Sequence, residues 1–205
     1  MTPLTLASAS PRRAHLLQSA GFRTVIRPID VDESSPDREH PARSLALRKA
    51  RAALHILNAE HGLPPFGLTA DTLVHLPDQP PLGKPTDRHD AARMLRALAG
   101  NTHLVTTAVT LFSLPEQRIL DTLDVTTAVH FLPLSDALID AYLDTDEPWD
   151  KAGAYAIQGL GASFVRAIEG SWSNVVGLPL AEVVSTLRTA GAFRLAPWEP
   201  TPPDP

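Results

Sequence analysis

Short apolar runs alternate with segments of helical periodicity through the first half of the chain, and this pattern limits the folds that it can adopt. The predicted strands there are 4–7, 22–29 and 66–76, and the predicted helices are 11–20, 41–60 and 87–98. Two β-rich segments, 102–114 and 118–132, follow with a short turn between them, which indicates a hairpin. Because an antiparallel pair intrudes into the alternation, we predict a mixed α/β sheet with flanking helices rather than a purely parallel one.

The remaining third of the chain continues the pattern with shorter elements. We expect a helix at 135–144, a partly glycine-rich and partly strand-like segment at 157–168, and a last helix at 179–189. With 205 residues, of which 43% are hydrophobic, the chain can bury a sizeable core as one domain, with or without two lobes. We therefore predict a single domain over 1–195 and a proline-rich tail over 196–205.

Composition excludes several kinds of site. The chain has no cysteine, which rules out disulfides, thiolate zinc sites and cysteine nucleophiles, so any metal must be bound by oxygen or imidazole. A net charge of -5 gives no general attraction for nucleic acid. The start MTPLTLAS has neither the basic region nor the apolar core of a signal peptide, and no run is long enough for a membrane span. We expect a cytoplasmic protein without nucleic-acid or membrane partners.

Lysine is scarce in this chain. Of 18 basic residues, only Lys49, Lys84 and Lys151 are lysines. Where arginine serves as the general cation, a retained lysine can mark a place that requires a compact ammonium group. Codon bias is the alternative explanation, and composition alone does not decide between them.

The stretch LASASPRRAHLL places two hydroxyls and two guanidinium groups where a predicted strand ends and a helix begins. Ser10 is a good N-cap and Pro11 suits the first helical position. The N–H groups of a helix N-terminus attract phosphate, and Ser8, Arg12 and Arg13 would extend this donor surface. The alternative is an ordinary helix cap with two solvated arginines.

Asp71 and Thr72 interrupt the apolar run 66–76 with polar groups. A carboxylate within such a run is costly to bury unless it is paired, bound to a metal or exposed at a cleft. Asp71 is therefore a candidate general base or metal ligand. A turn aspartate between two shorter strands is the alternative.

Two of the three lysines lie in predicted loops that contain glycine. LGKP holds Lys84 in a tight loop, and DKAGAYAIQGLG contains Lys151, Gln158 and several glycines. Glycine lets the backbone approach a ligand closely, and the Gln158 amide can bind a donor and an acceptor on a nucleobase edge. Lys49 differs because it lies on a predicted helix, where a lone lysine is usually solvated.

Familiar catalytic motifs are missing from the sequence. It contains no P-loop, no GxGxxG after a strand, no HExxH, no GxSxG and no EF-hand loop. The eight histidines show no metal-ligand spacing, so we expect them to be surface or packing residues. P-loop NTPases, dinucleotide enzymes, zinc proteases and serine hydrolases are therefore disfavoured.

Taken in order, LASASPRR, VDES, LRKAR, ADTLV, LGKP, DKAGAYAIQG and NVVGLPL resemble the Maf family of nucleoside triphosphate pyrophosphatases over about 4–187. The resemblance implies a Maf/ITPase-like mixed α/β sheet, two lobes around a central cleft, and a homodimer. It implies hydrolysis between the α and β phosphates, which releases the monophosphate and pyrophosphate. All three lysines fall within these motifs.

The resemblance also implies roles for individual residues. It makes Asp71 the general base, and Glu33 and Asp71 the ligands of a divalent cation such as Mg²⁺ or Mn²⁺. It assigns one set of residues to the phosphates: Ser8, Ser10, Arg13, Lys49, Lys84 and Lys151. It assigns Arg12, Thr72 and Gln158 to base selection.

The forms DKAGAY and IQG are similar to the branch of the family that acts on dTTP and UTP, with modified pyrimidine nucleotides as further expected substrates. Ala156 departs from the glycine that this motif usually carries. A nucleotide-binding regulator of septum formation is the alternative function, because such a protein would need the phosphate site but not the base. Whether Asp71 acts as a general base distinguishes the enzyme from the regulator.

Overall fold

The computed structural model describes residues 2–32, 37 and 40–193. The strands are β1 (Thr2–Leu6), β2 (Phe22–Ile26), β3 (Phe66–His75), β4 (Thr102–Ser113), β5 (Arg118–Phe131) and β6 (Val165–Glu169). The α-helices are α1 (Pro11–Ser19), α2 (Pro41–Leu57), α3 (Arg88–Leu98), α4 (Asp136–Leu143), α5 (Trp172–Val176) and α6 (Leu180–Thr189). Two short 3-10 helices are η1 (Ala152–Ala154) and η2 (Leu160–Phe164). No helix in the described ranges is both long and apolar enough to cross a lipid bilayer.

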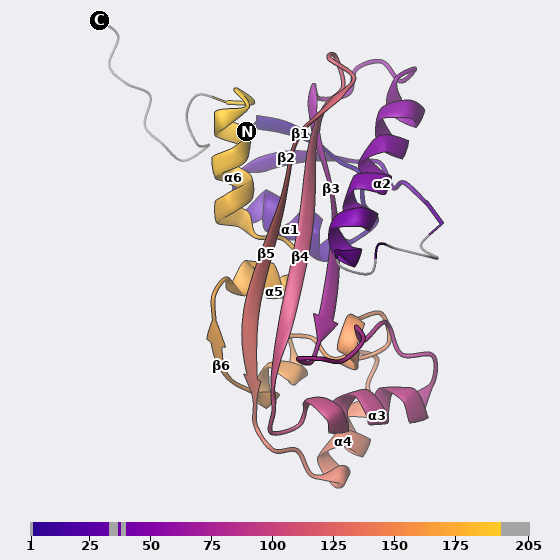
Figure 1. The fold of residues 1–205 in the computed structure, drawn as a ribbon, viewed down its shortest axis with the longest axis vertical. Helices are drawn as coiled ribbons and strands as arrows, with labels where there is room; N and C mark the ends of the chain where they lie inside the picture. Colours follow the sequence, from indigo (N-terminus) through magenta and orange to yellow (C-terminus); the bar gives the residue numbers. More distant parts are fainter. Residues whose placement is uncertain (1, 33–36, 38–39, 194–205) are drawn as a thin grey trace, which may run out of the picture. The chain divides into compact units, whose positions relative to one another are not determined.

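The strands form one six-stranded mixed sheet in the order β2-β1-β3-β4-β5-β6 (Figure 1). Strand β1 pairs in parallel with β2 and with β3, and Leu6 lies opposite Leu68 in the β3 register. Strands β4 and β5 form the predicted hairpin, and β6 adds antiparallel to β5. The predicted mixed α/β sheet with flanking helices is confirmed.

The chain divides into two compact units, each made of separate stretches of sequence. Unit 1 comprises Met1–Asp71, Ala108–Asp124 and Gly177–Pro205, and unit 2 comprises Thr72–Thr107 and Val125–Val176. The boundaries fall within β3, β4 and β5, so these strands contribute residues to both units. Each unit has a hydrophobic cluster of its own.

Local sequence signals fix the start of the first helix in unit 1. The Ser10 side chain caps α1 by accepting from the Arg13 N–H, and Pro11 occupies the first turn as predicted. Gly21 has a φ of 81°, a left-handed conformation that suits the residue after a helix.

Apolar residues of α2, including Ala50 and Leu54, pack in a cluster with Phe112 of β4.

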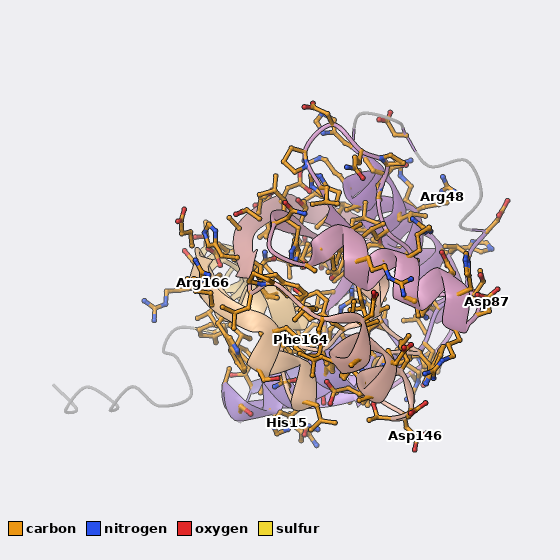
Figure 2. All side chains as sticks on the ribbon, turned by 90° about the horizontal axis from the view of Figure 1, so that it is seen from below. His15, Arg48, Asp87, Asp146, Phe164 and Arg166 are labelled. Carbon is orange, nitrogen blue, oxygen red and sulfur yellow. The ribbon has the colours of Figure 1, made fainter. Side chains whose placement is uncertain are left out.

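The core of unit 2 is built around aromatic side chains. Phe131, Tyr155, Tyr142 and Phe164 are buried, and their rings meet edge to face, with centroids 4.8 Å apart for Phe131 and Tyr155. The Tyr142 and Phe164 rings lie 4.9 Å apart, and Figure 2 labels Phe164 among the packed side chains. Helices α3 and α4 lie side by side in this unit (Figure 1). Edge-to-face contacts of this kind add to the stabilisation from buried apolar area.

One alternative for the third strand is wrong. β3 runs without interruption from Phe66 to His75, so Asp71 and Thr72 lie within a strand and not in a turn between two shorter ones. The polar groups of this strand have partners: the Thr69 hydroxyl donates to the Ala46 carbonyl at 2.7 Å, and Asp71 is paired with Lys49. A polar side chain can stay in a half-buried strand when its hydrogen bonds are made there.

Candidate active site

The stretch after β1 forms an ordered cluster of hydroxyl and guanidinium groups. Arg13 donates its Nε to the Gly177 carbonyl at 2.9 Å and its Nη1 to the Ser8 hydroxyl at 3.1 Å. The Ser8 hydroxyl also accepts from the Ser10 N–H at 3.2 Å. Two hydrogen bonds fix the plane of the Arg13 guanidinium, so this cation is oriented before any anion binds. Arg12 is half-buried on the same helical turn.

Lys49 and Asp71 form an enclosed ion pair in unit 1. Lys49 Nζ lies 2.9 Å from Asp71 Oδ1, and the two side chains are 15% and 13% exposed. Helix α2 is joined to β3 at Ala46, whose carbonyl accepts a hydrogen bond from the Thr69 hydroxyl. Because Ala46 lies about one turn before Lys49, this contact brings Lys49 close to β3. Lys49 is therefore not the solvated helix residue that is usual for a lone lysine.

The parallel pairing of β1 with β3 brings these two groups of residues to the same edge of the sheet. The Ala7 N–H donates to the Leu68 carbonyl at 2.9 Å, which continues the pairing of Leu6 with Leu68. Ser8 thus leaves β1 beside the part of β3 that leads to Asp71. The carboxyl edge of parallel strands is where ligands bind in open α/β sheets.

In unit 2, Thr72 belongs to a buried polar network. Its hydroxyl lies 2.9 Å from the Thr107 hydroxyl, which donates to the Asn174 carbonyl at 3.1 Å. The Asn174 amide donates to the Val105 carbonyl and to the Thr127 hydroxyl. The network consists of fully buried residues, Thr107, Thr127 and Asn174. Its hydrogen bond to the Thr72 hydroxyl therefore fixes that half-buried side chain against the core of unit 2.

Lys84 and Lys151 lie on segments that are hydrogen-bonded to each other. The Gly153 N–H donates to the Gly83 carbonyl at 3.1 Å, which joins the LGKP loop to η1. Lys84 is exposed. Lys151 Nζ donates to the Glu147 carbonyl at 2.7 Å and pairs with the Asp150 carboxylate.

Gln158 is exposed in the segment between η1 and η2. The carboxylate of Glu147 accepts from the N–H groups of Leu160 and Gly161, both at 2.8 Å, just after Gln158. Burial raises the pKa of Glu147, but these N–H donors and the Tyr142 hydroxyl together lower it below its ordinary value. Glu147 therefore carries a negative charge at neutral pH.

Several residues of this region were not identified from the sequence. Glu147, Tyr142, Thr107 and Asn174 hold the candidate residues in place, but their partners lie at sequence separations that no local motif records. The only available signal for Glu147 was its position four residues before Lys151 in the acidic run DTDEPWD.

The divalent-cation site stays a prediction. Glu33 lies outside the described residues, and within the described part of the chain no group of three or more His, Asp or Glu side chains could hold a metal ion. Mg²⁺ commonly binds through one or two carboxylates together with substrate phosphates, without a cage of protein ligands. The carboxylate of Asp71 is a hard oxygen donor of the kind that such a cation takes, and it fits this requirement.

Solved structures with the same fold include two Ham1 proteins. The HAM1 protein from Coxiella burnetii has a TM-score of 0.53 at 16% identity and covers 93% of this chain and 100% of its own. The Staphylococcus aureus Ham1 protein has a TM-score of 0.50 at 11% identity, over 92% of this chain and 99% of its own. At these identities the likeness concerns the fold.

Relatives found by sequence are much more similar to this chain than these solved structures are. Two proteins named dTTP/UTP pyrophosphatase, from Anaeromyxobacter sp. (strain Fw109-5) and Anaeromyxobacter dehalogenans (strain 2CP-1), are 48% and 50% identical over 96% of this chain. The alignments cover 92% and 97% of those relatives. A third protein of that name, from Syntrophotalea carbinolica, is 44% identical over 94% of this chain and 86% of its own. The family described as Maf-like protein matches residues 3–190, and this chain belongs to the Maf family.

Proposed function

We propose that this protein is a nucleoside triphosphate pyrophosphatase that hydrolyses dTTP and UTP to the monophosphate and pyrophosphate. The observation that carries the proposal is the enclosed pair of Lys49 and Asp71, 2.9 Å apart, in a chain about half identical to proteins named dTTP/UTP pyrophosphatase. An ionised carboxylate held beside an ammonium group can accept a proton, while the cation attracts phosphate oxygens.

In the proposed reaction, Asp71 takes a proton from water as the water oxygen bonds to the α-phosphorus. The bond from that phosphorus to the bridging oxygen then breaks, and pyrophosphate leaves with the bonding electrons. In unit 1, Ser8, Ser10, Arg13 and Lys49 bind phosphate oxygens, and Arg12 contributes to base selection. Arg13 suits this role because its guanidinium is already oriented by Gly177 and Ser8.

In unit 2, the proposal assigns Lys84 and Lys151 to the phosphates and Thr72 and Gln158 to the base. The amide of Gln158 has a donor and an acceptor, which match the imino and carbonyl groups of thymine and uracil. The hydroxyl of Thr72 is held by Thr107, so it can present one defined hydrogen-bonding direction.

A divalent cation, Mg²⁺ or Mn²⁺, is part of the proposal, with Asp71 and Glu33 as its ligands. When bound, such an ion neutralises negative charge on the phosphate oxygens. Assembly as a homodimer also belongs to the proposal, and light scattering on the purified protein tests it: a mass of twice 22.1 kDa is expected.

The Asp71→Asn variant tests the proposal. The amide keeps the shape of the side chain but cannot take the proton, so pyrophosphate release from dTTP should fall by about 10²- to 10⁴-fold. Binding of dTTP, measured by calorimetry, should remain. Asp124→Asn is the matched control, because it makes the same change in another unit 1 aspartate, which pairs with Arg43 at 2.8 Å.

Turnover by Asp71→Asn at the wild-type rate would contradict the assignment of the base. Loss of activity in the Asp124→Asn control to the same degree would show that the effect is not specific to Asp71. Because a nucleotide-binding regulator needs no general base, the same variant separates that alternative from an enzyme.

A further inference from the structure

Glu147 and Tyr142 tie down both ends of the segment that carries Gln158. The Glu147 carboxylate accepts from the Gly161 N–H at 2.8 Å through Oε1 and from the Leu160 N–H at 2.8 Å through Oε2. At the other end, the Ala156 N–H donates to the Tyr142 hydroxyl at 3.2 Å. Gln158 thus lies between two fixed points of the backbone.

The two anchoring side chains are bound to each other and to the core. The Tyr142 hydroxyl donates to Glu147 Oε1 at 2.9 Å, which makes Tyr142 and Glu147 a single unit, here called the clamp. Tyr142 is 4% exposed and its ring packs against Phe164. Tyr142 thus anchors the clamp in the core of unit 2, Glu147 is half-buried, and Gln158 is exposed.

Two glycines permit the close approach of the segment to the clamp. Gly159 has a φ of 110°, and a Cβ there would lie 2.3 Å from Glu147 Oε2. A Cβ at Gly161 would lie 2.6 Å from the Ala156 carbonyl oxygen and 3.0 Å from the Tyr142 hydroxyl. The distances of 2.3 Å at Gly159 and 2.6 Å at Gly161 are too short for a side chain, so the backbone can follow this path only with glycine at these positions.

We infer that the clamp is a positioning device for base selection: Tyr142 and Glu147 hold the backbone on both sides of Gln158, so that its amide meets the pyrimidine edge in one orientation. This inference rests on the proposed function. Neither clamp residue has to touch the nucleotide, because each acts through the backbone of 156–161. A fixed amide discriminates between bases better than a mobile one, since it cannot reorient to suit a different edge.

The clamp also reaches one of the candidate phosphate ligands. Lys151 Nζ donates to the Glu147 carbonyl at 2.7 Å, so the same residue orients a cation and the specificity segment. This contact uses the main chain of Glu147. A change of its side chain should therefore affect the choice of base more than the binding of phosphate.

The test compares Glu147→Gln and Tyr142→Phe with Gln158→Ala. In Glu147→Gln an NH₂ group replaces one of the oxygens that accept from Leu160 and Gly161. In Tyr142→Phe both hydroxyl contacts are lost. We expect the ratio of kcat/KM for dTTP and UTP to that for dCTP and ATP to fall by at least about tenfold in each clamp variant, because each variant loses a hydrogen bond to the charged Glu147 carboxylate.

Two further readouts separate positioning from a merely structural role. Adding Glu147→Gln to Gln158→Ala should not lower the ratio further, because the clamp acts through Gln158. Amide hydrogen exchange at Leu160 and Gly161, measured without nucleotide, should become faster in the clamp variants. Asp146→Asn is the control: it makes a comparable change one residue away, on a side chain that is exposed and projects outward in Figure 2.

Wild-type selectivity in both clamp variants, with selectivity lost in Gln158→Ala, would overturn the inference and leave the proposed function intact. Unchanged amide exchange at Leu160 and Gly161 would also overturn it. If Glu147→Gln does not fold, Tyr142→Phe alone decides the outcome. A wild-type protein that releases pyrophosphate without preferring dTTP and UTP would contradict the proposed substrates, and the role of the clamp with them.

Discussion

Arg12 and Arg13 are neighbours in sequence, but different roles are proposed for them. Arg13 is held by the Gly177 carbonyl and the Ser8 hydroxyl. The two arginines occupy successive positions of α1, so their side chains leave the helix in directions about 100° apart. This separation allows one guanidinium to serve the phosphates and the other the base.

Replacing each arginine by alanine should therefore have different effects. Arg13→Ala removes a charged hydrogen-bond donor and should lower kcat/KM about 10- to 100-fold for every nucleotide. Arg12→Ala should mainly change the ratio between nucleotides. Steady-state kinetics on dTTP, UTP, dCTP and ATP measure both, with the exposed Arg23→Ala as the control. Equal loss on all four nucleotides in Arg12→Ala would remove Arg12 from base selection.

At the level of residues, the sequence indicated where reactive groups are but not how they are held. Lys49 and Asp71 were each singled out, whereas their ion pair depends on a helix and a strand meeting in three dimensions. One partner of Arg13, the Gly177 carbonyl, lies 164 residues away. Glu147 was missed because its partners at Leu160 and Gly161 are main-chain N–H groups, which have no sequence signature.

Strand β3 shows how one element supports the candidate base. It carries Asp71, and close packing fixes its earlier part, where Gly67 meets the ring of Phe112. A Cβ at Gly67 would lie 2.3 Å from the ring, much closer than a van der Waals contact. The absence of a side chain at Gly67 is thus what lets Phe112 pack against this strand.

Gly67→Ala should force Phe112 out of its position and destabilise the protein by about 1–3 kcal/mol. Urea unfolding followed by circular dichroism measures this change. Gly83→Ala is the control, because a Cβ there would meet nothing within 4 Å and its effect should stay within about 0.5 kcal/mol. Equal stability of the Gly67→Ala variant and the wild type would contradict this close packing of Phe112 against β3.

Elements were predicted more reliably than their details. The helix starts at Pro11 and Pro41 and the cap at Ser135 agree with the structure, because local signals mark them: side-chain caps at Ser10 and Ser135, and a proline in the first turn at Pro11 and Pro41. The predicted helix to residue 60 ends earlier, at Leu57. The sequence predicted a strand over 66–76 but left a turn at Asp71 as the alternative, because the Lys49 that pairs with Asp71 lies on another element.

For the molecule as a whole, one buried histidine links stability to pH. His103 is fully buried, with Nε2 2.8 Å from the Tyr155 hydroxyl. Burial, with the nearby His130 and His75, lowers the pKa of His103 from 6.5 to about 4. Its Nδ1 atom has no partner among the described residues, so a proton there would be poorly solvated.

The pKa of His103 is lower in the folded state than in the unfolded state. Between pH 4 and pH 6.5, therefore, His103 binds a proton in the unfolded protein but not in the folded one. The stabilisation is complete above about pH 6.5 and is lost as the pH falls towards 4, by about 3 kcal/mol in total. Urea unfolding from pH 7 to pH 4 should show this loss. His103→Gln should have a flatter profile, and the exposed His89→Gln should keep the wild-type slope. A wild-type slope in His103→Gln would contradict the prediction.

The products that the protein releases identify its reaction. Purified protein is incubated with dTTP, UTP, dCTP and ATP, with and without Mg²⁺ or Mn²⁺, and pyrophosphate and orthophosphate are measured separately. We predict the release of pyrophosphate and the monophosphate from dTTP and UTP well above the other nucleotides, with a requirement for the cation. Release of orthophosphate, or no release from any nucleotide, would contradict the proposed function.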